Sequence, residues 1–174
     1  MGSTGLGLDI PPPNDPQATY RMQIAAALVG IKRSAGWFDW IAALSVVNSV
    51  ISLFNGNWTF VLGLGITQVI DYLAQRSGNS RGQLIGFVVT LLVAGFFWLM
   101  GRFAKQGQRW ALIVGMFLYT LDGLVLVVGR AWLSVAFHGY ALFMLSRGFA
   151  AIKQYETAKH EAEGHGLFMN NPAG

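Results

Sequence analysis

The chain has 174 residues, of which 53% are hydrophobic and 11% are charged, and it contains no cysteine. Soluble domains carry about 25% charged residues, so this composition indicates a protein that lies in a lipid bilayer. The missing cysteines exclude a disulfide, a thiolate metal site and a cysteine nucleophile. The net charge of +4 comes from bases in the short gaps between apolar runs. There they orient membrane helices, and we therefore expect no nucleic-acid binding.

The composition changes along the chain and divides it into four parts. Residues 1–19 are rich in Gly, Pro, Asn and Asp and are predicted to form a disordered N-terminal tail. Residues 20–34 are too short to cross a bilayer and are bracketed by Arg21 and Lys32, which predicts an interfacial amphipathic helix lying in the headgroup layer. Residues 35–155 are predicted to form a transmembrane helical bundle, and residues 156–174 a polar, flexible C-terminal tail.

Four apolar segments within the predicted bundle have the length of membrane spans, which is about 17–25 residues. They run from Trp37 to Phe54, Gln83 to Gly101, Trp110 to Gly129 and Trp132 to Phe149. All six tryptophans lie at or near the ends of apolar segments, where their rings anchor helices at the membrane surface. The predicted fold class is therefore all-α, a multi-pass transmembrane bundle with an N-terminal interfacial helix.

Residues 58–74 leave the number of spans at four or five, because this segment has the minimum length for a span but contains Gly63, Gly65, Thr67, Gln68 and Asp71. With five spans the bases divide equally, six on each side of the membrane. If residues 58–74 do not cross, nine bases lie on the side of both termini and three lie opposite, namely Arg76, Arg81 and Arg130. The positive-inside rule therefore favours four spans, a re-entrant or half-buried helix and cytoplasmic termini, although length and tryptophan placement still allow five.

The strongest candidate site lies in the hairpin that runs from Trp110 to Arg147 and turns at Gly129, Arg130 and Ala131. Asp122 lies eight residues before Arg130 and His138 eight residues after it. At about 1.5 Å per residue, both lie roughly 12 Å from the turn, near the middle of the bilayer. Because lipid cannot solvate them, we expect the two side chains to pair across the hairpin, with Tyr119 or Ser134 completing the hydrogen bonds.

Two roles remain open for this intramembrane pair. Buried ionisable groups in a membrane are candidates for a proton relay or a cation site. A hydrogen-bonded clasp that fixes the hairpin needs the same residue types at the same depth, and we favour the clasp. A weaker candidate is the face shared by Gln68, Asp71 and Tyr72, where a structural ion pair of Asp71 with Arg76 is favoured over a site.

Small residues recur at the spacing that lets helices approach closely. One stripe consists of Gly82, Gly86, Thr90 and Ala94, and a second includes Ser45 and Ser49. We interpret both stripes as helix-packing faces, through which the protein would contact a second copy or a larger complex.

Catalytic and cofactor chemistry is poorly supported by the sequence. The membrane segments contain one histidine, so haem held by two imidazoles would need a partner chain. In the tail, His160 and His165 are five residues apart, one too many for a zinc-protease HExxH helix. We therefore predict no catalytic residues, no metal site and no cofactor.

The first functional hypothesis is a non-enzymatic, multi-pass integral protein of the bacterial inner membrane that acts as a subunit or scaffold. Its expected partners are the lipid bilayer and a second copy or a larger membrane complex. The alternative is a small channel or transporter for protons or small ions that uses Asp71, Asp122 and His138. A membrane-embedded enzyme ranks third.

Overall fold

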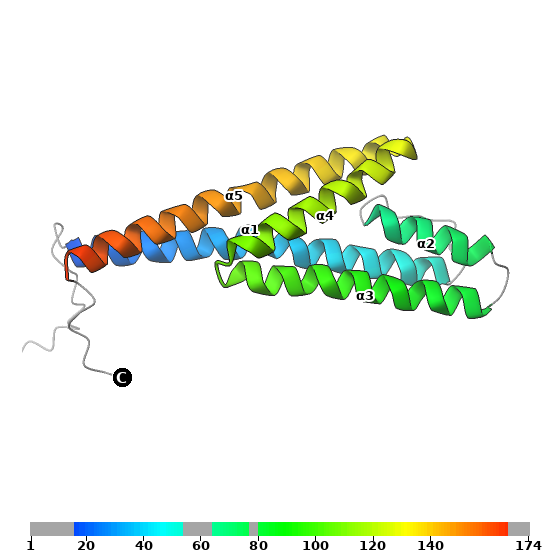
Figure 1. Ribbon diagram of the computed structural model, residues 1–174, viewed down its shortest axis with the longest axis horizontal. Coiled ribbons are helices and arrows are strands. Elements are labelled where there is room, and N and C mark those ends of the chain that lie inside the picture. The colour runs from blue at the N-terminus through cyan, green and yellow to red at the C-terminus, as the bar shows by residue number, and fades with distance from the viewer. Residues whose placement is uncertain (1–15, 54–63, 77–79, 167–174) are drawn as a thin grey trace, which may run out of the picture.

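The computed structural model describes residues 16–53, 64–76 and 80–166, and these residues form helices joined by short turns (Figure 1). The five helices are α1 (Pro16–Leu53), α2 (Gly65–Arg76), α3 (Ser80–Lys105), α4 (Arg109–Val128) and α5 (Trp132–Gly164). Within the described residues, α1, α3, α4 and α5 are long and apolar enough to cross a membrane. The predicted all-helical class is confirmed, and the number of such helices is four.

Helix α1 corrects the prediction of a separate interfacial helix. Residues 20–34 and the first predicted span as far as Leu53 are parts of one continuous 38-residue helix, which also includes residues 16–19 of the predicted tail. A single Gly36 costs a helix only about 1 kcal/mol relative to alanine, and the stretch contains no proline to break it. The Ser34 hydroxyl, next to the expected break, donates to the carbonyl oxygens of Met144 and Leu145 at 3.0 and 2.9 Å. Packing on α5 thus holds the helix straight through the charged gap.

Most residues of the two stripes of small residues are buried in the bundle. Ser45 and Ser49 on α1 are buried, as are Thr90 and Ala94 on α3. Gly86 is also buried and Gly82 is half-buried. Because α1 and α3 pack against each other, the burial of these residues fits their interpretation as helix-packing faces. That a second copy or a larger complex contacts the protein through them stays a prediction.

The α4–α5 hairpin turns at the predicted residues. Helix α4 ends at Val128 and α5 begins at Trp132. Arg130 adopts the left-handed region with φ of 56°, and the Ala131 N–H donates to the carbonyl of Leu126 at 3.0 Å. The turn brings the two apolar helices side by side, so residues equally distant from Arg130 lie at similar depth.

Helix α2 is the shortest of the described helices, with 12 residues. At about 1.5 Å per residue it is about 18 Å long, too short for a hydrocarbon core of about 30 Å. Its first residues lie inside the bundle, because the N–H of Leu64 donates to the Ser45 hydroxyl at 3.0 Å. From there it packs along α3 (Figure 1), and the re-entrant or half-buried helix stays a prediction. Residues 58–63 of the ambiguous segment lie outside the described residues.

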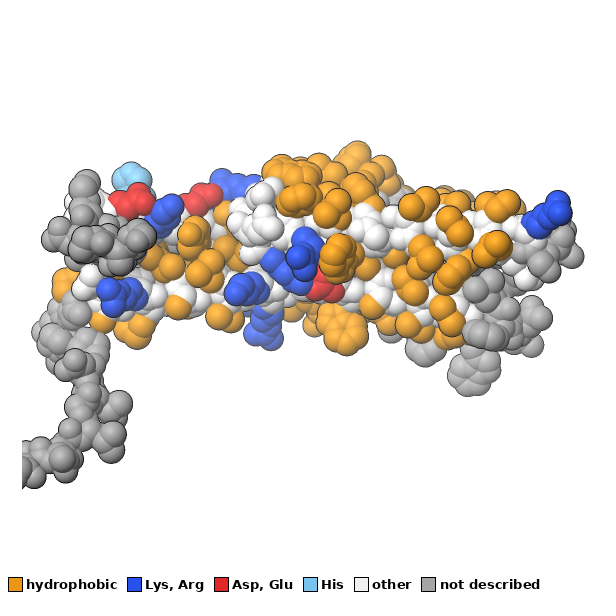
Figure 2. Space-filling view, turned by 90° about the horizontal axis from the view of Figure 1, so that it is seen from below, with side chains coloured by type: hydrophobic (Ala, Val, Ile, Leu, Met, Phe, Trp, Pro, Cys, Tyr) orange, Lys and Arg blue, Asp and Glu red, His pale blue; other side chains and the backbone are white. Residues whose placement is uncertain are grey.

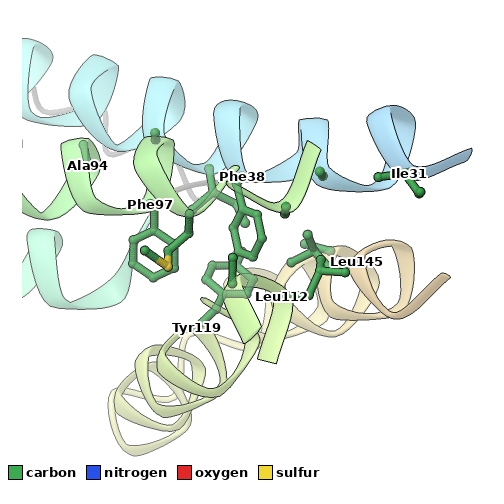
Figure 3. Close-up of a cluster of buried hydrophobic side chains, with 14 of the residues drawn as sticks. Ile31, Phe38, Ala94, Phe97, Leu112, Tyr119 and Leu145 are labelled. Carbon is green, nitrogen blue, oxygen red and sulfur yellow. The ribbon is translucent and has the colours of Figure 1, made fainter. Parts of the chain in front are cut away.

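The buried hydrophobic core of the bundle is formed by α1, α3, α4 and α5, and three aromatic rings pack in it where α1, α3 and α4 meet (Figure 3). The rings of Phe38 and Phe97 have centroids 6.2 Å apart, and those of Phe97 and Tyr119 are 6.1 Å apart. A Cβ on Gly115 would lie 2.4 Å from Cζ of Phe38. Only a glycine at this position of α4 lets the Phe38 ring reach the centre.

The surface of the molecule is divided by residue type. Figure 2 shows a face on which hydrophobic side chains gather over one half, while most Lys and Arg side chains lie over the other half and the centre. The exposed side chains of the described residues include large apolar residues that a soluble protein would bury, namely Leu92, Ile113, Phe117, Leu133 and Phe143. Four apolar helices with such a surface are compatible with a small membrane protein.

Helices α1 and α5 extend beyond α3 and α4 as a two-helix projection (Figure 1), formed by the N-terminal part of α1 and by the part of α5 that follows Glu156, which pairs with Arg109 at the start of α4. Ala27 and Ile31 of α1 are buried there, as are Ala158 and Ala162 of α5. Residues 156–164, predicted as flexible tail, are therefore helical because they pack against α1. Residues 167–174 lie outside the described residues, as do residues 1–15.

Candidate functional site

Asp122 of α4 and His138 of α5 face each other inside the hairpin. Nε2 of His138 lies 2.9 Å from Oδ2 of Asp122, and the two residues are only 2% and 6% exposed. The turn geometry explains the meeting, since each residue is eight positions from Arg130. The structure thus brings together the two residues of the hairpin that are most costly to bury in a bilayer.

The second ring nitrogen of His138 defines the protonation of this pair. Nδ1 lies 2.8 Å from the backbone carbonyl oxygen of Ser134, which can only accept, so Nδ1 carries a proton. The contact between Nε2 and Oδ2 is a hydrogen bond only if one further proton lies between them. With that proton on Nε2, His138 donates to the Asp122 carboxylate, and the opposite charges of the two side chains cancel. Ser134 therefore contributes through its backbone, not through the hydroxyl that the sequence suggested.

Asp122 also caps the N-terminus of α2. The N–H of Gly65 donates to Oδ2 of Asp122 and the N–H of Ile66 donates to Oδ1, both at 2.7 Å. Backbone N–H groups at a helix start have no partner within the helix, and the helix dipole favours a negative charge there. A side chain 57 residues away in sequence thus does what a neighbouring Ser or Asp usually does.

The local sequence of α2 offers no strong cap of its own. The residue before Gly65 is Leu64, whose side chain cannot accept a hydrogen bond. Thr67 closes part of the first turn by donating its hydroxyl to the Leu64 carbonyl at 2.8 Å. Sequence reasoning missed the capping role of Asp122, and the one signal for it was an apolar helix start that lacks a capping residue.

Gly65 lets α2 approach α4 closely enough for these bonds. A Cβ at this position would lie 2.7 Å from Cγ of Leu126 and 3.1 Å from the backbone carbonyl oxygen of Asp122. Real Cβ atoms do not come that close to a side-chain carbon, so a larger residue would push the helix start away from the carboxylate. Gly65 and Asp122 together determine how closely the start of α2 packs against α4.

Tyr119 stacks on His138 instead of binding the pair. The two ring centroids are 4.2 Å apart and the planes are inclined by 14°. The Tyr119 hydroxyl is buried and has no hydrogen-bond partner among the described residues. Tyr119 therefore fixes the plane of the imidazole through ring contact, and Phe97 packs edge-on against the Tyr119 ring.

A groove of about 500 Å³ lies between α2, α3 and α4 and includes Asp122 in its lining. The other lining residues are apolar, and they include Ile66, Phe96, Phe97, Leu118 and Val125. An apolar wall of this kind excludes water from the side of the carboxylate that faces the groove. The carboxylate therefore depends on the three donors from Gly65, Ile66 and His138.

The second predicted constellation is only partly described. Gln68 and Asp71 lie on α2, but their side chains lie outside what the structure describes. Arg76, expected near Asp71, donates to the hydroxyl of Tyr72 at 3.4 Å and lies over its ring. In the described part of the chain, no three His, Asp or Glu side chains gather as they would around a metal ion.

Comparisons with protein-family models, curated proteins and solved structures find no match to this chain.

Proposed function

We propose that this chain is a small, multi-pass integral membrane protein without enzymatic activity, a subunit or scaffold of the bacterial inner membrane. The four apolar helices fit a membrane-embedded protein by length and hydropathy. The observation that carries the proposal is the saturation of Asp122: both carboxylate oxygens are bound by donors of the same chain. Because the hydrogen-bond partners of Asp122 all come from the same chain, we infer that this residue stabilises the fold.

The energies favour a clasp over a relay. An aspartate near the bilayer centre costs about 2.5–3.5 kcal/mol. Each hydrogen bond to a charged group contributes about 1.5–3 kcal/mol, so the three donors offset that cost. Passing the shared proton onward would require breaking one of these bonds in an apolar surrounding. The pair is therefore better suited to holding α2 on the α4–α5 hairpin than to exchanging protons.

The charge distribution supports cytoplasmic termini. With four crossing helices, the bases on α1, α5 and the α3–α4 turn lie on one side of the membrane, and Arg76, Arg81 and Arg130 lie on the other. On this topology the two-helix projection of α1 and α5 stands in the cytoplasm. It exposes Met22, Leu28 and Val29, and these apolar side chains support it as a surface for a partner.

The test of the clasp is Asp122→Asn in the purified full chain. An amide cannot accept from Gly65, Ile66 and His138 at once, so we expect a loss of about 1–3 kcal/mol of unfolding free energy and a lower Tm in detergent. Liposomes containing the variant should be as tight to protons as those containing the wild type. The matched control is Asp39→Asn, which removes a half-exposed carboxylate from its ion pair with Lys105 and should cost at most about 1 kcal/mol.

One observation favours a second candidate, a small channel or transporter for protons or small ions that uses Asp71, Asp122 and His138. Asp122 is among the residues that line the groove between α2, α3 and α4, so a small ion that entered the groove would reach its carboxylate. Wild-type proteoliposomes would then dissipate a pH gradient, and Asp122→Asn would abolish this flux while leaving Tm unchanged. That pair of results would overturn the clasp in favour of transport.

A further inference from the structure

A second groove, of about 380 Å³, lies between α1 and α5 where the projection leaves the bundle. Arg33 and Arg147 line it from the two helices, together with Gly30, Ser34, Ala151 and Gln154. The helices cross closely here, since a Cβ on Gly30 would lie 3.1 Å from Cβ of Ala151. The groove therefore has a floor of small residues and a guanidinium group from each helix.

Three other bases of this end of the molecule have partners within the chain. Lys105 pairs with Asp39 and Arg109 with Glu156, and Arg102 lies over the ring of Trp98. Arg33 and Arg147 are exposed, and neither has a hydrogen bond or ion pair within the described residues. Two positive charges on one groove, without an acid to neutralise them, define a site for an anion.

The depth of the groove indicates which anion. Arg33 precedes the end of α1 by about 20 residues, or about 30 Å of helix, the thickness of a hydrocarbon core. Arg147 lies at the same level, because Ser34 binds the carbonyls of Met144 and Leu145. One turn toward the bundle, the rings of Trp37 and Tyr140 pack at 5.3 Å, as aromatic side chains do at a membrane surface.

We propose that this groove binds the phosphate of an anionic phospholipid, an inference that rests on the proposed membrane location. Guanidinium groups bind phosphate oxygens in a bidentate manner. The acyl chains would lie along the exposed rings of Tyr140 and Phe143. A phosphatidylcholine headgroup would bring its own cation toward the two guanidinium groups, so the groove discriminates against it.

The test uses the full chain in mild detergent with added phosphatidylglycerol, phosphatidylcholine or inorganic phosphate. Native mass spectrometry measures the bound lipid, and thermal unfolding measures the shift in Tm. The variants are Arg33→Gln and Arg147→Gln. The matched control is Lys32→Gln, which removes an exposed base at the same depth that does not line the groove.

Phosphatidylglycerol should bind in preference to phosphatidylcholine and raise Tm. Each arginine variant should weaken this binding about tenfold, since one charge-assisted hydrogen bond is worth about one decade or more of affinity, and Lys32→Gln should leave it unchanged. Equal binding of both lipids, or equal weakening by Lys32→Gln, would overturn the site. An equal shift in Tm with inorganic phosphate alone would overturn the assignment to a lipid.

Membrane location is tested separately by extraction of the expressed chain with alkaline carbonate. A chain released by carbonate would overturn the proposed function. A chain that stays in the membrane but shows no lipid preference would overturn the lipid site alone. The two failures are therefore distinguishable.

Discussion

Replacing Gly65 by alanine should move the start of α2 away from the Asp122 carboxylate that caps it. The new Cβ would lie 2.7 and 2.9 Å from Cγ and Cδ2 of Leu126, and 3.1 Å from the carbonyl oxygen of Asp122. Leu126 is buried, so its side chain has little room to turn away. The carbonyl belongs to the α4 backbone and is fixed by the helix. Relief therefore requires the start of α2 to move away from α4.

The expected change in unfolding free energy is the balance of a steric cost and a smaller gain in helix propensity. Overpacking of one methyl group costs about 1–3 kcal/mol, and the movement also lengthens the 2.7 Å bonds from Gly65 and Ile66 to the carboxylate. Alanine is a better helix former than glycine by about 1 kcal/mol, which reduces the loss without reversing it. We expect a net loss of about 1–3 kcal/mol in unfolding free energy.

The assay is unfolding of the full chain in detergent, followed by circular dichroism, together with hydrogen exchange of the α2 amides. Gly95→Ala and Gly139→Ala are matched controls, because both glycines are helical and a Cβ on either would meet nothing within 4 Å. These controls should be neutral or stabilising by up to about 1 kcal/mol. If Gly65→Ala were as stable as Gly95→Ala and left α2 exchange unchanged, the tight seating of α2 on Asp122 would be wrong.

Three further substitutions probe the core and the site. Gly115→Ala would place a Cβ 2.4 Å from the Phe38 ring and should cost about 1–3 kcal/mol; Phe38→Leu in the same chain should recover part of the lost Tm, and no recovery would contradict the contact. Tyr119→Phe removes a buried hydroxyl with no partner in the described chain. Because burying such a group costs about 1–3 kcal/mol, Tm should stay equal or rise. A clear fall in Tm would show that the hydroxyl is hydrogen-bonded. His138→Leu leaves the carboxylate with one donor fewer and should cost about 3–5 kcal/mol, measured as denaturant midpoint; a loss as small as that of Asp39→Asn would refute the pairing.

The long apolar helices could be predicted because their signal is local. The hairpin turn at Gly129, Arg130 and Ala131 and the ends of α4 follow from apolar runs of span length with tryptophans beside them. The meeting of Asp122 with His138 follows from their equal distance to that turn. These inferences need only the helical rise and the cost of burying charge.

That α1 is one continuous helix could not be predicted from a local signal of this kind. Hydropathy drops at Lys32 and Arg33, and a window of apolar residues ends there. Hydropathy, however, reports the surroundings of a segment and not where its backbone hydrogen bonds stop. What keeps α1 helical across the gap is contact with α5, through Ser34 and through Gly30 against Ala151, and those partners are more than 100 residues away in sequence.

The seating of α2 shows why the role of Asp122 is more than pairing. With 12 residues, α2 is at the length where an isolated helix is marginal, and it lacks a strong capping residue. The carboxylate, for its part, has a single donor in His138 unless α2 is present. Each therefore supplies what the other lacks: the helix start gives two N–H groups to a buried acid, and the acid gives a cap to a short helix. A buried polar pair that looked like a transport site from sequence thus fixes the one described helix that is too short to cross the membrane.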